Sequence, residues 1–79
     1  MKFYGSMICS DCVYAAKRIN QRNIDLEYVD ITDNIHNLKE FLRLRDSRPE
    51  FDDIKAFGKV GIPCFLYDDG RIEFDVDML

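Results

Sequence analysis

The stretch Phe3–Cys12, FYGSMICSDC, places two cysteines where an N-terminal run of strand-forming residues gives way to a helical pattern. Phe3–Ile8 has the apolar character of a buried strand. Four residues then recur at helical spacing and form one apolar stripe: Cys12, Ala15, Ala16 and Ile19. We therefore predict a strand followed by a helix, with Cys9 at or just before the first helical turn and Cys12 one turn later, facing inward.

This placement favours thiol–disulfide chemistry. The first backbone N–H groups of a helix have no intrahelical partner and carry a partial positive charge, so a sulfur placed there ionises more easily. Two intervening residues also bring the two sulfurs close enough for a reducible disulfide. We expect Cys9 to be the exposed, attacking thiol and Cys12 to be the shielded thiol that resolves the mixed disulfide.

The next segment predicts a second strand and a second helix. Leu26–Ile31 is rich in β-branched and aromatic residues, as strands are. Asp33 or Asn34 is then expected to cap a helix. The residues of that helix that we expect to face inward are Ile35, Leu38, Phe41 and Leu42. A strand, helix, strand order implies a parallel pair with a right-handed crossover.

The rest of the chain predicts a short helix and a hairpin. Ser47-Arg48-Pro49-Glu50 has Ser at a cap position and Pro in the first turn, and the helix is expected to reach Phe57 and end at Gly58. Ile62–Tyr67 and Arg71–Val76 are strand-like runs that flank a turn with Gly. The order indicates a single α/β domain, residues 1–79, built on a four-stranded mixed sheet with flanking helices.

Composition excludes some partners. The 79 residues carry a net charge of −4, without a cluster of Lys and Arg, which argues against a nucleic-acid or anionic-membrane partner. The hydrophobic fraction of 47% indicates a globular domain. The sequence begins without an apolar leader segment, so we expect a cytoplasmic protein, in which three cysteines indicate catalysis or metal binding rather than structural disulfides. We expect it to be a monomer.

The chain resembles the glutaredoxin branch of the thioredoxin superfamily. The resemblance rests on Cys9-Ser10-Asp11-Cys12, on Gly61-Ile62-Pro63 and on the hairpin turn Asp69-Gly70, and it covers nearly the whole chain. It implies a thioredoxin-like fold with a cis Ile62–Pro63 bond beside the cysteines. It also implies that Ile62 and Pro63 bind the substrate, with the Ile62 backbone pairing with the extended backbone of the substrate. Pro63 taken alone also fits an ordinary edge-strand proline.

The cysteine motif departs from the family pattern in its charges. The family usually has a Lys shortly before the first cysteine, and here no cation lies nearby in the sequence. Asp11 lies between the two cysteines instead, and a carboxylate there opposes thiolate formation. Ser10 and Asp11 are therefore the residues that we expect to modulate the pKa of the motif. A simpler interpretation of Asp11 is a carboxylate that complements the helix dipole.

The C-terminal end departs from the family as well. The family's Gly-Gly-x-Asp-Asp segment, which holds glutathione, is replaced by Glu73–Asp77, and bulky Phe74 hinders the close backbone approach that glycine allows. We therefore expect no resident cofactor, with glutathione left only as a candidate reductant whose binding motif is degenerate. The chain also ends at Leu79, where the family would begin a final helix, so we expect that helix to be missing and the sheet beside the first helix to be thinly covered.

Cys64 has two interpretations. It is either a small buried hydrophobe of the third strand, or it joins Cys9 and Cys12 in a metal or iron–sulfur site, with His36 as a fourth ligand. We favour the first and expect no metal. The sequence thus predicts a small thiol–disulfide oxidoreductase that acts on a disulfide-containing protein or a small thiol, with a metal-binding protein on the same fold as the alternative.

Overall fold

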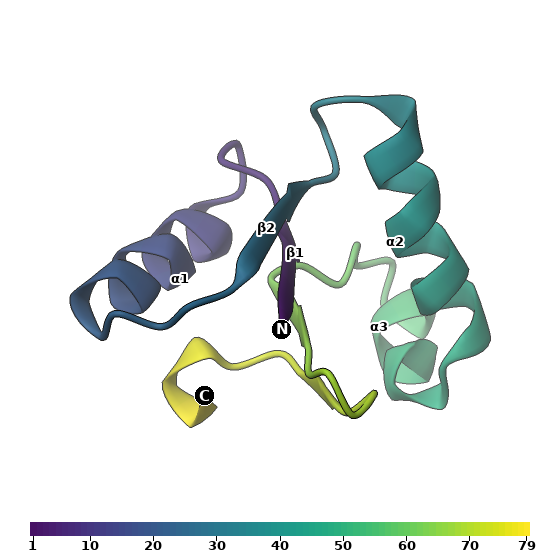
Figure 1. Ribbon diagram of the computed structural model, residues 1–79. Helices are drawn as coiled ribbons and strands as arrows, with labels where there is room; N and C mark the ends of the chain where they lie inside the picture. Colours follow the sequence, from purple (N-terminus) through teal and green to yellow (C-terminus); the bar gives the residue numbers. More distant parts are fainter.

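The computed structural model describes all residues, 1–79. It contains four strands and three helices in the order β1, α1, β2, α2, α3, β3, β4 (Figure 1). Their bounds are β1 (Lys2–Gly5), α1 (Ser10–Gln21), β2 (Glu27–Asp30), α2 (Ile35–Ser47), α3 (Asp52–Ala56), β3 (Cys64–Leu66) and β4 (Ile72–Glu73). Two 3₁₀ turns complete the chain, η1 (Pro49–Phe51) directly before α3 and η2 (Val76–Met78) at the C-terminal end.

The strands form one mixed sheet in the order β2-β1-β3-β4. β1 and β2 are parallel, with Phe3 opposite Tyr28, whereas β3 is antiparallel to both β1 and β4. The parallel pair is joined through α1, as the strand, helix, strand order predicts. The four-stranded mixed sheet expected from the sequence is therefore confirmed.

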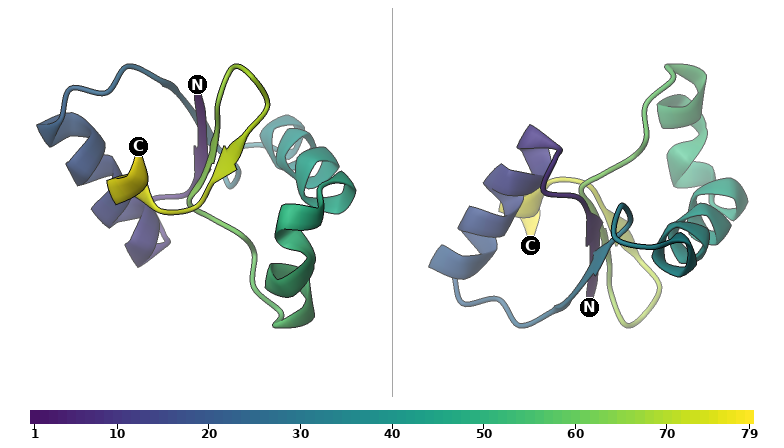
Figure 2. Two further views of the ribbon diagram at one scale, coloured as in Figure 1. Left: turned by 90° about the horizontal axis from the view of Figure 1, so that it is seen from below. Right: turned by 90° about the horizontal axis from the view of Figure 1, so that it is seen from above.

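Each face of the sheet carries its own buried cluster. Figure 2 shows α1 and the C-terminal turn on one side of the sheet and α2 with α3 on the other. The residues buried on the α1 side are Phe3, Cys12, Ala15, Phe65 and Val76. Those buried on the α2 side are Tyr4, Val29, Ile31, Phe41, Phe51 and Cys64. Phe3 and Tyr4 thus point to opposite sides, as do Cys64 and Phe65, because successive strand residues alternate.

The strands are shorter than the sequence predicts. β1 ends at Gly5 instead of Ile8, because the chain turns there and the Cys9 N–H bonds the Ser6 carbonyl at 3.0 Å. β4 covers Ile72–Glu73 instead of Arg71–Val76. Beyond it, the Glu73 carboxylate accepts hydrogen bonds from the N–H groups of Phe74 and Asp75, both at 3.0 Å. Such local side-chain bonds compete with a strand ladder and end it.

Two details around α2 also differ from the prediction. Asn34 caps the helix as expected, since its side chain accepts a bond from the Asn37 N–H at 2.8 Å. Ile35 was expected to face inward, and this is wrong, because its side chain is 66% exposed at the first helical position. Ser47 does not cap the short helix either. It is the last residue of α2, and its hydroxyl donates to the Arg43 carbonyl at 2.7 Å.

The C-terminal end is better covered than expected. The turn η2 packs beside α1, where the Tyr14 hydroxyl and Arg18 Nε each bond the Asp77 carboxylate at 2.9 Å. The Arg22 guanidinium reaches the carbonyls of Val76 and Leu79. The expected absence of an α-helix after β4 is confirmed, but the expectation that the sheet beside the first helix is thinly covered is wrong. A single 3₁₀ turn, held by side chains of α1, lies there.

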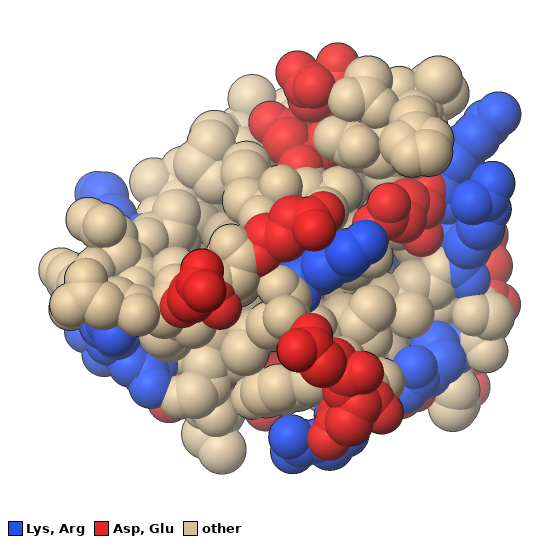
Figure 3. Space-filling view, in the orientation of Figure 1, with Lys and Arg blue, Asp and Glu red and all other residues tan.

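Charged groups of both signs share the visible surface. In the orientation of Figure 3, acidic groups are spread across the middle of the face, and basic groups lie mainly along its outer edges. None of the helices combines the length with the apolar composition that crossing a bilayer requires.

Candidate dithiol site

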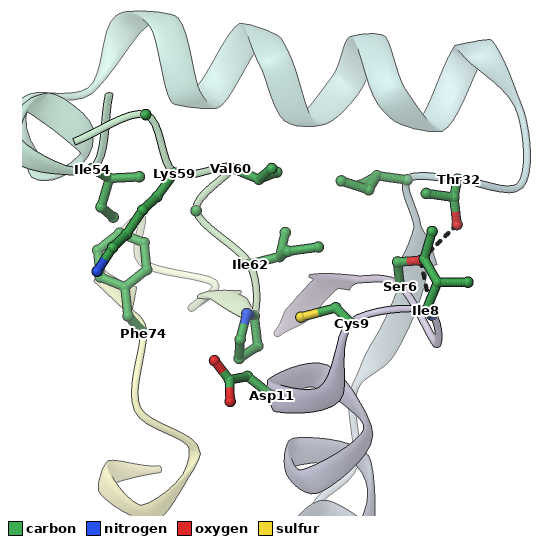
Figure 4. A pocket seen from close by; sticks show the side chains of 14 residues that line it. Ser6, Ile8, Cys9, Asp11, Thr32, Ile54, Lys59, Val60, Ile62 and Phe74 are labelled. Carbon is green, nitrogen blue, oxygen red and sulfur yellow. Dashed lines mark hydrogen bonds between the residues drawn. The ribbon is translucent and has the colours of Figure 1, made fainter. Parts of the chain in front are cut away.

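Cys9 lies at the N-terminal end of α1. It is the N-cap residue, with extended backbone angles of φ −101° and ψ 120°, and its carbonyl accepts the Val13 N–H at 3.0 Å. Its side chain is half-buried and lines a pocket of about 720 Å³. In Figure 4 the sulfur points from the start of α1 into this pocket, below Ile62. The predicted position of Cys9 at the start of the helix is confirmed.

Cys12 lies one turn further on and is fully buried. Gly5 makes room for its sulfur, because a Cβ atom at position 5 would lie 3.2 Å from Cys12 Sγ and 2.6 Å from the Phe3 ring. Burial raises the pKa of the Cys12 thiol to about 12. A hydrogen bond from the Ser6 backbone opposes this rise in pKa, whereas the neighbouring Cys9 thiol and the Asp11 charge add to it. Cys9 and Cys12 are both free thiols, so one accessible and one protonated sulfur lie side by side.

Ile62 and Pro63 line the same pocket as Cys9. The Ile62–Pro63 peptide bond is cis, as the resemblance implied. Gly61 precedes it with φ +103°, a conformation that favours glycine, and the Phe51 ring would lie 2.9 Å from a Cβ atom there. Neither the N–H nor the carbonyl of Ile62 has a hydrogen-bond partner within the chain. The backbone of Ile62 is therefore free to pair with an added extended segment.

Ser10 and Asp11 differ in their relation to this pocket. Both are exposed residues of the first turn of α1, but only Asp11 lines the pocket. The Asp11 charge contributes to the raised pKa of Cys12. Its place at the start of the helix also suits the helix dipole, so the two interpretations of Asp11 are compatible.

Cys64 and His36 lie away from the dithiol. Cys64 is fully buried in the cluster on the α2 side of the sheet, whereas Cys12 belongs to the cluster on the α1 side. Burial raises the pKa of the Cys64 thiol to about 12. His36 is exposed in the first turn of α2. The chain contains no group of three or more His, Cys, Asp or Glu side chains arranged to hold a metal ion. The interpretation of Cys64 as a buried core residue is confirmed.

Three pocket residues are not apparent from the sequence. Ser6 is almost fully buried, and its hydroxyl lies 2.7 Å from that of Thr32, which follows β2. Lys59 belongs to the loop that leads to Pro63 and lines the pocket. It supplies a cation there, whereas the residues next to Cys9 in the sequence include none. A small polar residue after a strand is too common to be singled out, and Lys59 is separated from Cys9 by 50 positions (59 − 9) in the chain. Only the fold brings the three together.

These features define a small α/β protein with two free cysteines at a helix N-terminus, the first of which faces a cis-proline loop across an open pocket. The chain is 38% identical over 71 residues to an uncharacterized protein of Haemophilus influenzae, a match that spans 90% of this chain and 83% of that protein. It therefore belongs to the same family as that protein. No family model and no solved structure matches the chain.

Proposed function

We propose that this protein is a thiol–disulfide oxidoreductase, similar to glutaredoxins, on a thioredoxin-like fold. The observation that carries the proposal is that half-buried Cys9 and the cis Ile62–Pro63 bond line one pocket, with the fully buried Cys12 thiol beside Cys9. The half-buried Cys9 thiol, which lines the pocket, is positioned to meet a substrate, and the buried Cys12 thiol is positioned to act only after the first has reacted.

The reaction proceeds in two exchanges. The Cys9 thiolate attacks one sulfur of a substrate disulfide, the substrate S–S bond breaks, and the leaving sulfur departs as a thiolate that takes up a proton. Cys12 then loses its proton and attacks the Cys9 sulfur, which breaks the mixed disulfide and releases the second substrate thiol. The substrate gains two electrons, and the protein is left with a Cys9–Cys12 disulfide. Another thiol or a partner protein returns those electrons.

The surroundings of the dithiol suit these steps. Cys9 is the N-cap residue of α1, so its side chain lies at the helix end where the first N–H groups have no intrahelical partner. The raised pKa of Cys12 keeps that thiol protonated while Cys9 attacks. The unpaired N–H and carbonyl of Ile62 provide hydrogen bonds for the backbone of a bound segment, as in the pairing that the resemblance implies.

Substitution of each cysteine tests the proposal. In the Cys9→Ser variant we expect no reduction of a disulfide-linked test substrate. In the Cys12→Ser variant we expect a mixed disulfide to accumulate on Cys9, visible by mass spectrometry without reductant. Cys64→Ala is the matched control, because Cys64 is buried on the other side of the sheet. Its activity should be unchanged.

A redox titration of the Cys64→Ala variant adds a second measure. A dithiol that reduces substrates in a glutathione-buffered compartment has a potential between about −200 and −270 mV. Full activity of the Cys9→Ser variant, or no mixed disulfide with Cys12→Ser, would contradict the assigned roles.

A further inference from the structure

The pocket around Cys9 is bordered by aliphatic side chains from separate parts of the chain. Ile8, directly before Cys9, is 87% exposed, and Val60, from the loop before β3, is 53% exposed. In Figure 4 Val60 and Ile62 lie above the Cys9 sulfur and Ile8 lies to one side of it. Exposed aliphatic side chains beside a reactive sulfur have no role in the core of this domain, so they are available to a partner.

The apolar surface continues beyond the pocket. Ile31, Thr32 and Val60 line both the Cys9 pocket and an adjoining hollow that reaches α2. Ile35 lies in that hollow and is 66% exposed. Ile8, Val60 and Ile35, here called the apolar rim, are thus exposed aliphatic residues that line the Cys9 pocket or the hollow adjoining it.

Charges are confined to one part of the pocket. Its only Lys, Arg, Asp or Glu residues are Asp11 and Lys59, and neither forms an ion pair within the chain. Figure 4 shows both on the opposite side of Cys9 from Ile8. A small anionic thiol with two carboxylates would be attracted by one cation, Lys59, and repelled by the carboxylate of Asp11. An uncharged apolar segment fits the Ile8 side without losing ion pairs or hydration of charges.

We propose that the substrate is an extended segment of another protein in which large apolar side chains flank the disulfide-bonded cysteine. This inference rests on the proposed function and specifies its substrate class. The substrate backbone pairs with Ile62, its cysteine meets Cys9, and its apolar neighbours cover the apolar rim.

Peptide disulfides test the inference directly. The probes are symmetrical disulfides of the capped pentapeptide Ser-X-Cys-X-Ser, in which X is Leu, Ser or Asp. We expect the Leu peptide to have a kcat/KM about tenfold or more above that of the Ser peptide, because burial of one Leu side chain is worth that much. The Asp peptide should be the poorest substrate, because the Ile8 side of the pocket offers no cation.

Substitutions in the apolar rim test whether these residues cause the preference for the Leu peptide. Ile8→Ser and Val60→Ser should each lower the preference for Leu, measured as kcat/KM of the Leu peptide divided by that of the Ser peptide, about threefold to tenfold. Both side chains are exposed, so the fold should survive, which circular dichroism and an unchanged alkylation rate of Cys9 would verify. Phe57→Ser is the matched control, since Phe57 is 77% exposed and does not line the pocket. It should keep the preference for Leu.

The outcomes separate the two proposals. If the wild-type protein reduces none of the peptides, the proposed function is wrong. If it reduces the Leu, Ser and Asp peptides equally well, the function stands and the apolar substrate class is wrong. Light scattering tests a further outcome. If the wild-type protein is a dimer and the Ile8→Ser variant is a monomer, a second copy of the chain covers the apolar rim, and this too would overturn the inference.

Discussion

The hydroxyl groups of Ser6 and Thr32 lie 2.7 Å apart and tie the loop after β1 to the loop after β2. Thr32 Oγ1 also donates to Asp30 Oδ1 at 2.7 Å, so Ser6 is the donor to Thr32. The same Ser6 accepts the Cys9 N–H on its carbonyl. The link therefore steadies the segment that presents Cys9 to the pocket.

The first prediction concerns this link. Thr32→Val should lower the free energy of unfolding by about 1–3 kcal/mol, because it leaves the buried Ser6 hydroxyl without an acceptor. Ser6→Ala should cost less, since exposed Thr32 can bond water instead. The double variant should recover part of the loss relative to Thr32→Val alone. Urea denaturation would measure all three, and a larger cost for Ser6→Ala would contradict this account of the link.

The second prediction concerns the resolving step. Because burial raises the pKa of Cys12 to about 12, its thiol is mostly protonated at neutral pH. Resolution of a preformed mixed disulfide on Cys9 should therefore accelerate as the pH rises from about 6 to about 9. Asp11→Asn should speed this step about twofold to threefold at a given pH, because it removes a charge that raises the Cys12 pKa.

Stopped-flow measurement of thiol release would follow this step. Ser10→Ala is the matched control and should leave the rate unchanged, since the groups that shift the Cys12 pKa include Asp11 but not Ser10, contrary to the role expected for Ser10 from the sequence. A rate that does not vary with pH would mean that ionisation of Cys12 does not limit resolution.

The third prediction concerns glutathione. The N–H groups of Phe74 and Asp75 are already bonded by the Glu73 carboxylate, and the Phe74 ring packs edge-on against Phe51 at 5.1 Å. These two N–H groups are therefore not free to bond a peptide ligand. Turnover of a glutathione mixed disulfide should be about tenfold or more below that of a glutaredoxin that retains the glycine pair, measured in the same coupled assay. Equal rates in the two proteins would refute the prediction.

The fourth prediction concerns the C-terminal turn. Hydrogen bonds from Arg18 and Tyr14 hold the pKa of Asp77 below its usual value of 3.8. A lowered folded-state pKa stabilises the fold above the unfolded pKa, and this contribution is lost as the pH falls through the folded pKa. Asp77→Asn should thus lower the urea midpoint at neutral pH, and the difference from wild type should shrink as the pH falls below the usual pKa of 3.8.

Asp25→Asn is the control for this measurement, because exposed Asp25 has no hydrogen-bond or ion-pair partner. Its midpoint should match that of the wild type at both pH values. If the Asp77→Asn difference persists unchanged in acid, the carboxylate charge is not what holds the turn.

Local sequence patterns were sufficient to predict the order of the helices and strands and the position of the two cysteines at the start of α1. The helical spacing of Cys12 and Ala15 predicted that Cys12 faces inward, and both residues are fully buried. Asn34 was among the expected caps of α2, because its short side chain reaches an N–H three residues on. Such relationships span one or two turns of backbone, so the nearby residues decide them.

The sequence by itself determined an α/β chain with a cysteine pair at the start of a helix, because propensity and periodicity act over neighbouring residues. Only the tertiary structure decided that Ser6, Thr32 and Lys59 share the Cys9 pocket, because these residues come from three separate loops. It also placed η2 against α1, through bonds between Asp77 and the side chains of Tyr14 and Arg18. Contacts between residues 59 or more positions apart depend on how the sheet folds the chain back, and no local pattern encodes them.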